Sequence, residues 1–181
     1  MTQIKGPDSG EKIVRIERLT PALGAELDID LGHINAEGAQ AVYDALMAHQ
    51  VVFFRDQQIT PEQHIALGAH FGAIDIPHPL SQNHERIPAI TVLENDEHRP
   101  PDTNDWHKDL TFREAPPFMS ILYAKSVPET GGDTLWANMG LAYDNLAPAV
   151  RAMLDPLEAV HDIGCFRNDY LGPDKNVEAM N

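Results

Sequence analysis

The sequence predicts a mixed α and β fold, with a β-rich core and helices around it. Short runs of β-branched and aromatic residues, such as residues 51–54, are typical of strands. Two longer stretches repeat apolar residues at helical spacing and start with the capping residues Asn35 and Thr60. With 181 residues, 43% of them hydrophobic, the chain can bury the core of one domain. We therefore expect one ordered domain over residues 12–181, after a flexible polar tail over residues 1–11.

The first ordered elements are expected to be a strand and a long helix. Mixed apolar and polar alternation predicts a strand over residues 13–19. From Ile34 onwards apolar residues recur at helical spacing, with Asn35 placed to cap the helix and Glu37 in its first turn. This pattern predicts a helix of about four turns, at about 3.6 residues per turn.

A strand and a second helix follow directly. Residues 51–54 have the sequence Val-Val-Phe-Phe, which predicts a short strand buried on both faces. Thr60 and Gln63 have the spacing of a capping box, in which each side chain bonds the backbone N–H of the other residue. A helix over residues 61–71 is therefore expected, with Gly72 as its stop.

The rest of the chain is predicted to hold further strands and two short helices. Strands are expected over residues 89–93, 119–126, 134–137 and 157–161. The sequence Thr-Gly-Gly-Asp at residues 130–133 predicts a turn between the second and third of these strands. Helical spacing over residues 141–154 is interrupted by Pro148, which cannot sit inside a regular helix, so two short helices are expected.

Composition argues against some classes of partner. The chain has 13 Lys and Arg against 28 Asp and Glu, a formal net charge of −15, which would repel a nucleic-acid backbone. The first 15 residues contain no apolar run, unlike a secretory signal or a membrane span. Cys165 is the only cysteine, so no internal disulfide can form. We expect a soluble, cytoplasmic protein that binds neither nucleic acid nor a membrane.

The chemistry of the chain is concentrated in the sequence Trp-His-Lys-Asp at residues 106–109. On an extended backbone, His107 and Asp109 project to the same face because they are two residues apart. An imidazole and a carboxylate on one face make up two thirds of the metal-binding triad of non-haem Fe(II) oxygenases. A surface histidine beside a solvated aspartate is the alternative, because such a tripeptide often occurs by chance.

Several longer motifs occur in the same order as in one known family. They are Leu-Gly-Ala-Glu at residues 23–26, His-Gln-Val-Val-Phe-Phe-Arg-Asp-Gln at 49–57, Asp-Trp-His-Lys-Asp-Leu-Thr-Phe at 105–112 and Gly-Gly-Asp-Thr-Leu-Trp at 131–136. Over nearly its whole length the chain resembles the taurine dioxygenase (TauD/TfdA) family of Fe(II)- and 2-oxoglutarate-dependent dioxygenases. The resemblance implies an α+β fold with a double-stranded β-helix (jelly-roll) core and flanking helices, incomplete at the C-terminus. Residues 12–181 would then be a partial domain of this kind.

The resemblance also implies roles for three residues. His107 and Asp109 match ligands of the Fe(II) cofactor, and Thr134 matches the residue that bonds the distal carboxylate of the co-substrate 2-oxoglutarate. A hydroxyl just after a double-glycine turn can reach an anion with little obstruction, although an ordinary strand threonine is the alternative for Thr134. The implied reaction hydroxylates a substrate with O₂ and releases succinate and CO₂.

The substrate implied by the resemblance is a small organic anion, such as a sulfonate like taurine, an alkyl sulfate or an aryloxy acid. His78 matches a substrate-binding histidine of the taurine enzymes, whereas Ser81 and Thr103 stand where those enzymes have tyrosine and asparagine. These departures weaken taurine as the substrate, because lost polar partners discriminate strongly among ligands. Phe166 is a further candidate for the pocket, with a core aromatic as its alternative, and His78 could instead be a structural loop residue.

Two residues that the family has in its active site have no counterpart among these 181 residues. The second histidine of the triad, and an arginine that pairs with 2-oxoglutarate, lie in the family downstream of the stretch that these residues resemble. His161 falls on an expected strand, but the resemblance gives it no place on the metal. The chain is therefore expected to be a fragment, or a truncated and inactive copy. One alternative is a non-catalytic interaction or oligomerisation module, in which case the protein could form a homo-oligomer. The other is a cupin that uses another metal.

Overall fold

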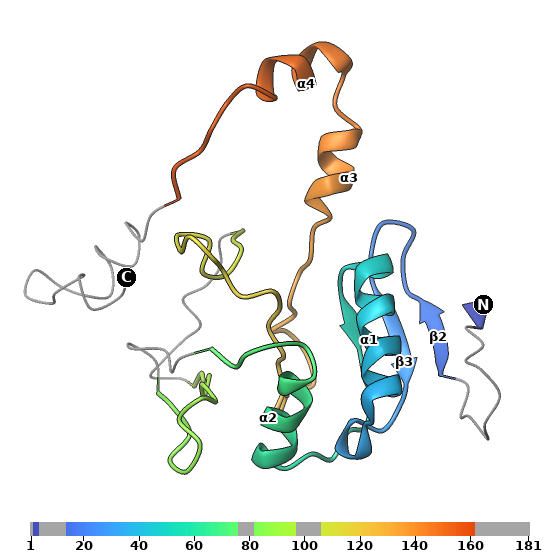
Figure 1. Cartoon of the computed structure of the whole chain (residues 1–181), viewed down its shortest axis with the longest axis vertical. Helices are drawn as coiled ribbons and strands as arrows, with labels where there is room; N and C mark the ends of the chain where they lie inside the picture. Colours follow the sequence, from blue (N-terminus) through green and yellow to red (C-terminus); the bar gives the residue numbers. More distant parts are fainter. Residues whose placement is uncertain (1, 4–13, 76–81, 97–105, 162–181) are drawn as a thin grey trace, which may run out of the picture. The chain divides into compact units, whose positions relative to one another are not determined.

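The computed structural model describes residues 2–3, 14–75, 82–96 and 106–161 (Figure 1). The chain divides into two compact units. The first consists of Met1–Ile74 and Ala124–Arg151, and the second of Asp75–Tyr123 and Ala152–Asn181. None of the helices in the described ranges has the length and apolar character needed to cross a membrane.

The first unit contains a four-stranded sheet. Its strands are β1 (Thr2–Gln3), β2 (Arg15–Arg18), β3 (Ala25–Asp28) and β4 (Val52–Phe53), in that spatial order. β2 and β3 are antiparallel, with Ile16 opposite Leu27, whereas β3 and β4 are parallel. A parallel pair cannot be joined by a tight turn, and here the connection is helix α1 (Ala36–His49). The strand expected over residues 13–19 is present as the shorter β2, and residue 13 lies outside the described residues.

Helix α1 covers the sheet as its sequence predicts. The side chain of Asn35 accepts a hydrogen bond from the N–H of Gly38, and the 14 residues give the expected four turns. The helix ends at His49, and the capping residue Gln50 has a left-handed φ of 67° and an N–H that bonds the carbonyl of Leu46. The apolar face of α1 closes the core of this unit, which contains Ile16, Ala25, Leu27, Val42 and Ala45. Figure 1 shows α1 lying alongside β3.

Helix α2 (Pro61–Ala69) has the predicted capping box. The hydroxyl of Thr60 accepts from the N–H of Gln63 at 3.2 Å, and the N–H of Thr60 donates to Oε1 of Gln63 at 2.8 Å. The helix ends at Ala69 rather than at the predicted residue 71. The N–H of Phe71 bonds the carbonyl of Gly68, so the last residues form a tighter turn before Gly72, whose φ is 146°.

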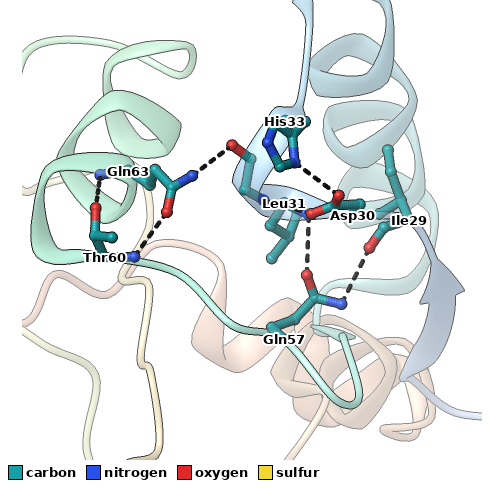
Figure 2. Close-up of polar contacts among 8 residues, drawn as sticks. Ile29, Asp30, Leu31, His33, Gln57, Thr60 and Gln63 are labelled. Atoms are coloured by element: carbon teal, nitrogen blue, oxygen red, sulfur yellow. Dashed lines mark hydrogen bonds and ion pairs between the residues drawn. The ribbon is translucent and has the colours of Figure 1, made fainter.

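Two glutamines tie a 3-10 turn, η1 (Leu31–His33), to the chain on either side of α2's start (Figure 2). Gln57 accepts from the N–H of Leu31 at 2.9 Å and donates to the carbonyl of Ile29 at 3.1 Å. Besides its capping role, Gln63 donates from Nε2 to the carbonyl of Gly32 at 2.9 Å. Segments about thirty positions apart are therefore held together through side-chain amides, which satisfy backbone groups that no ladder pairs.

The strand expected at residues 51–54 is shorter and more exposed than predicted. Only Val52–Phe53 form β4, and the side chains of residues 51–54 are half-buried rather than buried. β4 is at the edge of the described sheet, so it has a neighbouring strand on one side only. Burial on both faces, which a central parallel strand would have, was a wrong prediction.

Four other predicted strands are wrong in the described structure. No strand forms over residues 89–93, 119–126, 134–137 or 157–161. The first of these segments has a single antiparallel bridge, between Asn83 and Thr91. Strand propensity favours an extended backbone, but a strand also needs a partner, and these segments join no ladder within the described ranges.

The break predicted in the later helical segment is confirmed. Helix α3 (Met139–Asp144) and helix α4 (Pro148–Leu154) replace one continuous helix, and Pro148 begins the second of them. Proline is tolerated in a first turn because its missing N–H would have no partner there. The helices and small sheet agree with the mixed α and β class.

Candidate active site

His107 and Asp109 lie side by side in the second unit. Nε2 of His107 is 3.4 Å from Oδ1 of Asp109, and their side chains are 57% and 61% exposed. A turn begins at Asp109, where Leu110 has a left-handed φ of 53°. The structure therefore brings these two predicted site residues together at the point where an irregular segment turns.

The spacing of the two side chains is compatible with a shared divalent metal ion. Donor atoms that each bind one small divalent ion at about 2.1 Å can lie no more than about 4.2 Å apart. The 3.4 Å between His107 Nε2 and Asp109 Oδ1 meets this condition without any movement of the side chains. A neutral imidazole with a carboxylate is also a donor set that suits Fe(II). Within the described ranges, no group of three His, Cys, Asp or Glu residues is placed to hold a metal.

The other carboxylate oxygen of Asp109 has a different partner. Ser120 donates a hydrogen bond from its hydroxyl to Oδ2 of Asp109 at 3.1 Å. The two oxygens of Asp109 are therefore in different surroundings, one beside an imidazole and the other on a hydroxyl. The sequence predicted only that Ser120 belongs to a strand, because nothing in a single serine indicates a partner eleven residues away.

Two longer-range contacts tether the turn that follows Asp109. Arg113 donates from Nη1 to both carboxylate oxygens of Asp75, at 2.9 and 2.6 Å. Nδ1 of His161 lies 2.9 Å from the hydroxyl of Thr111. His161, considered above as a possible ligand, is thus bound at one ring nitrogen to the residue two positions after Asp109. Neither contact could be read from the sequence, since no motif relates these residues.

Thr134 belongs to the first unit and is exposed there. The double glycine before it has φ angles of 80° at Gly131 and 71° at Gly132, so the turn uses a backbone that other residues rarely adopt. Two residues after Thr134, the ring of Trp136 meets Phe53 of β4 edge to face, with centroids 6.5 Å apart. The segment that carries Thr134 is therefore anchored on the sheet of its own unit.

The candidate substrate residues His78, Ser81, Thr103 and Phe166 lie outside the described residues, so their predicted roles remain predictions.

The chain is similar to known dioxygenases. Residues 15–179 match the family described as taurine catabolism dioxygenase TauD, TfdA family. An alkylsulfatase of Acinetobacter baylyi is 35% identical over 171 residues, covering 91% of this chain and 51% of that protein. An alpha-ketoglutarate-dependent sulfate ester dioxygenase of Pseudomonas putida is 36% identical over 142 residues, covering 76% and 44%.

A solved structure shows the same similarity in three dimensions. The crystal structure of a taurine dioxygenase from Burkholderia xenovorans superposes with a TM-score of 0.69 at 34% identity, covering 79% of this chain and 51% of that one. The chain spans about half the length of the curated relatives described here.

Proposed function

The chain belongs to the TauD/TfdA family of dioxygenases, and on that premise we propose that it supplies part of the active site of a Fe(II)- and 2-oxoglutarate-dependent dioxygenase. The observation that carries the proposal is the pairing of His107 Nε2 with Asp109 Oδ1 at 3.4 Å. Family membership favours this reading over a surface histidine beside a solvated aspartate. It likewise favours an enzyme over a non-catalytic interaction module.

Each of the three residues has a separate task in this proposal. His107 binds Fe(II) through Nε2, and Asp109 contributes a carboxylate oxygen with the opposite charge to the metal. Thr134 donates its hydroxyl to the distal carboxylate of 2-oxoglutarate. When bound, Fe(II) and 2-oxoglutarate supply the oxidising chemistry, in which O₂ is consumed, 2-oxoglutarate becomes succinate and CO₂, and the substrate gains a hydroxyl. The side chains hold these groups in position and do not themselves change in the reaction.

We extend the proposal to the fold of the complete enzyme, a double-stranded β-helix core with flanking helices. The TM-score of 0.69 to a taurine dioxygenase supports this.

The proposed substrate is a small organic anion, with a sulfate ester first among the candidates. Two relatives at 35% and 36% identity are an alkylsulfatase and a sulfate ester dioxygenase. His78, Ser81, Thr103 and Phe166 are the proposed substrate contacts. Ser81 and Thr103 replace the tyrosine and asparagine expected for taurine, which favours a ligand with different polar groups. Sulfonates and aryloxy acids are the competing classes.

A substrate panel tests the proposal. The full-length protein that carries these residues is supplied with Fe(II), 2-oxoglutarate and O₂, together with an alkyl sulfate, taurine or an aryloxypropionate. Succinate should form in proportion to consumed substrate with at least one compound, and most rapidly with the alkyl sulfate. A hydroxyl added to the carbon that bears the sulfate oxygen makes that C–O bond break, so inorganic sulfate and an aldehyde should accumulate together. No substrate-dependent succinate with any of these classes would contradict the proposal.

A further inference from the structure

We propose that Ser120 is a positioning residue that fixes which oxygen of Asp109 binds the metal. The inference rests on the proposed function, because it takes His107 and Asp109 as metal ligands. Ser120 holds Oδ2 by a hydrogen bond of 3.1 Å, and Oδ1 is the oxygen 3.4 Å from His107 Nε2. The hydroxyl thereby leaves Oδ1 beside the imidazole, where one ion can meet both donors.

The carboxylate needs such a partner because its own torsion does not distinguish the two oxygens. Rotation of an aspartate carboxylate about its last bond is broad and roughly two-fold, so either oxygen could face the histidine. The side chain of Asp109 is 61% exposed, and water can hydrate both oxygens equally. A hydroxyl attached to the protein is the feature that makes them different, since serine can donate and an ionised carboxylate can only accept.

The placement of Ser120 depends on the turn that separates it from Asp109. Ser120 lies eleven positions after Asp109 in the sequence. The chain reverses at Leu110, which has a φ of 53°, and Arg113 within the turn is bound to Asp75. These contacts hold the returning segment where its serine reaches Asp109. Outer hydrogen-bond partners of this kind commonly orient metal ligands.

Metal titration measures the effect directly. Mn(II), which replaces Fe(II) without oxidation, is titrated into the full-length protein that carries these residues, by calorimetry and by electron paramagnetic resonance, without O₂. Ser120→Ala should weaken Mn(II) binding by up to about ten-fold, the lower end of the range for outer partners, because this hydrogen bond is exposed. Ser120→Cys, of similar size but a weak donor, should weaken it in the same direction. Ser120→Thr keeps the hydroxyl and should bind nearly as the parent does.

The resonance spectrum gives a readout that a general loss of stability would not change. In Ser120→Ala the bound Mn(II) spectrum should broaden, because the carboxylate now binds in more than one way. Ser126→Ala is the matched control, the same substitution at an exposed serine in the other unit, and should change neither affinity nor spectrum. The thermal midpoint without metal should be alike for all four variants.

The outcomes distinguish the proposed metal pair, His107 and Asp109, from the proposed positioning role of Ser120. If His107→Ala and Asp109→Ala bind Mn(II) as tightly as the parent, the metal pair itself is wrong and the proposed function fails. If those variants lose binding but Ser120→Ala and Ser120→Cys both bind normally, the metal pair stands and the positioning role is overturned. Equal losses in Ser120→Ala and Ser120→Thr would also overturn it, because the hydroxyl would then not be the cause.

Discussion

Arg113 donates from a single nitrogen, Nη1, to both carboxylate oxygens of Asp75, which lies 38 residues earlier in the sequence. The Arg113 side chain is only 21% exposed and that of Asp75 is 40% exposed. A partly shielded ion pair is less weakened by water and salt than one at the surface. The pair therefore joins Asp75 to Arg113, which directly follows the turn that begins at Asp109, and so helps to hold that turn in place.

The first prediction is that this ion pair stabilises the second unit. Arg113→Ala, Asp75→Ala and the double variant should give a coupling free energy of about 1 kcal/mol or somewhat more, measured by urea unfolding. Arg55 and Glu26 provide the matched control pair, with a 3.1 Å contact and side chains 68% and 37% exposed. Their coupling should be smaller. An equal coupling in both cycles would show that shielding by the turn contributes nothing.

The second prediction concerns the proposed ligands. His107→Ala or Asp109→Ala should abolish succinate formation, because a single remaining protein donor in this segment holds a divalent ion weakly. Lys108→Ala is the control from the same segment, since alternate side chains of an extended backbone point to opposite faces. It should keep both metal binding and turnover. Turnover at the parent rate in either ligand variant would remove the metal assignment.

The third prediction concerns 2-oxoglutarate. Thr134→Val removes one hydrogen bond to a carboxylate, a loss of about 1 kcal/mol, so half-maximal activity should need about five-fold more 2-oxoglutarate. Metal affinity should not change, because the threonine is not a proposed ligand. Thr130→Val, on the other side of the double glycine, should leave the 2-oxoglutarate titration unaltered. If the two valine variants have the same titration curve, Thr134 is a structural residue.

The fourth prediction separates the two roles of Gln63. Gln63→Ala loses both the capping bond to Thr60 and the bond to the carbonyl of Gly32, and should lower the free energy of unfolding by about 1–2 kcal/mol. Gln63→Glu can still cap α2 but sets an oxygen against the Gly32 carbonyl, so it should also destabilise. Gln40→Ala, which removes an exposed helical pair with Asp44, should cost only a few tenths of a kcal/mol. If Gln63→Glu is as stable as the parent protein, the hydrogen bond from Gln63 to the Gly32 carbonyl contributes little to stability.

The fifth prediction applies to the 181-residue polypeptide taken alone. His107 and Asp109 form a pair, and the described ranges contain no third donor grouped with them. Metal affinity depends on the number of ligands and on a held geometry, so a site made of this pair alone should bind Mn(II) far more weakly than a site with three protein donors. Anaerobic calorimetry measures it. Tight stoichiometric binding would point to a third ligand within these residues, with His161 and His78 the first to replace.

The sequence by itself determined the features that depend on neighbouring residues. Helices α1 and α2 begin where Asn35 and Thr60 predict, because a cap acts on backbone groups within one turn of itself. The helical break at Pro148 is equally local, since the missing N–H is a property of that residue. The candidate pair His107 and Asp109 also needed only a spacing of two, together with the family resemblance.

The tertiary structure decided what depends on distant partners. The segments expected as strands at residues 119–126 and 134–137 have suitable side chains, yet a strand exists only where another strand meets it. Ser120 reaches Asp109 across eleven positions and Arg113 reaches Asp75 across 38, and no local pattern indicates either contact. A single residue sets the chemical nature of a metal ligand, whereas the orientation of that ligand depends on which distant groups the folded chain brings into contact with it.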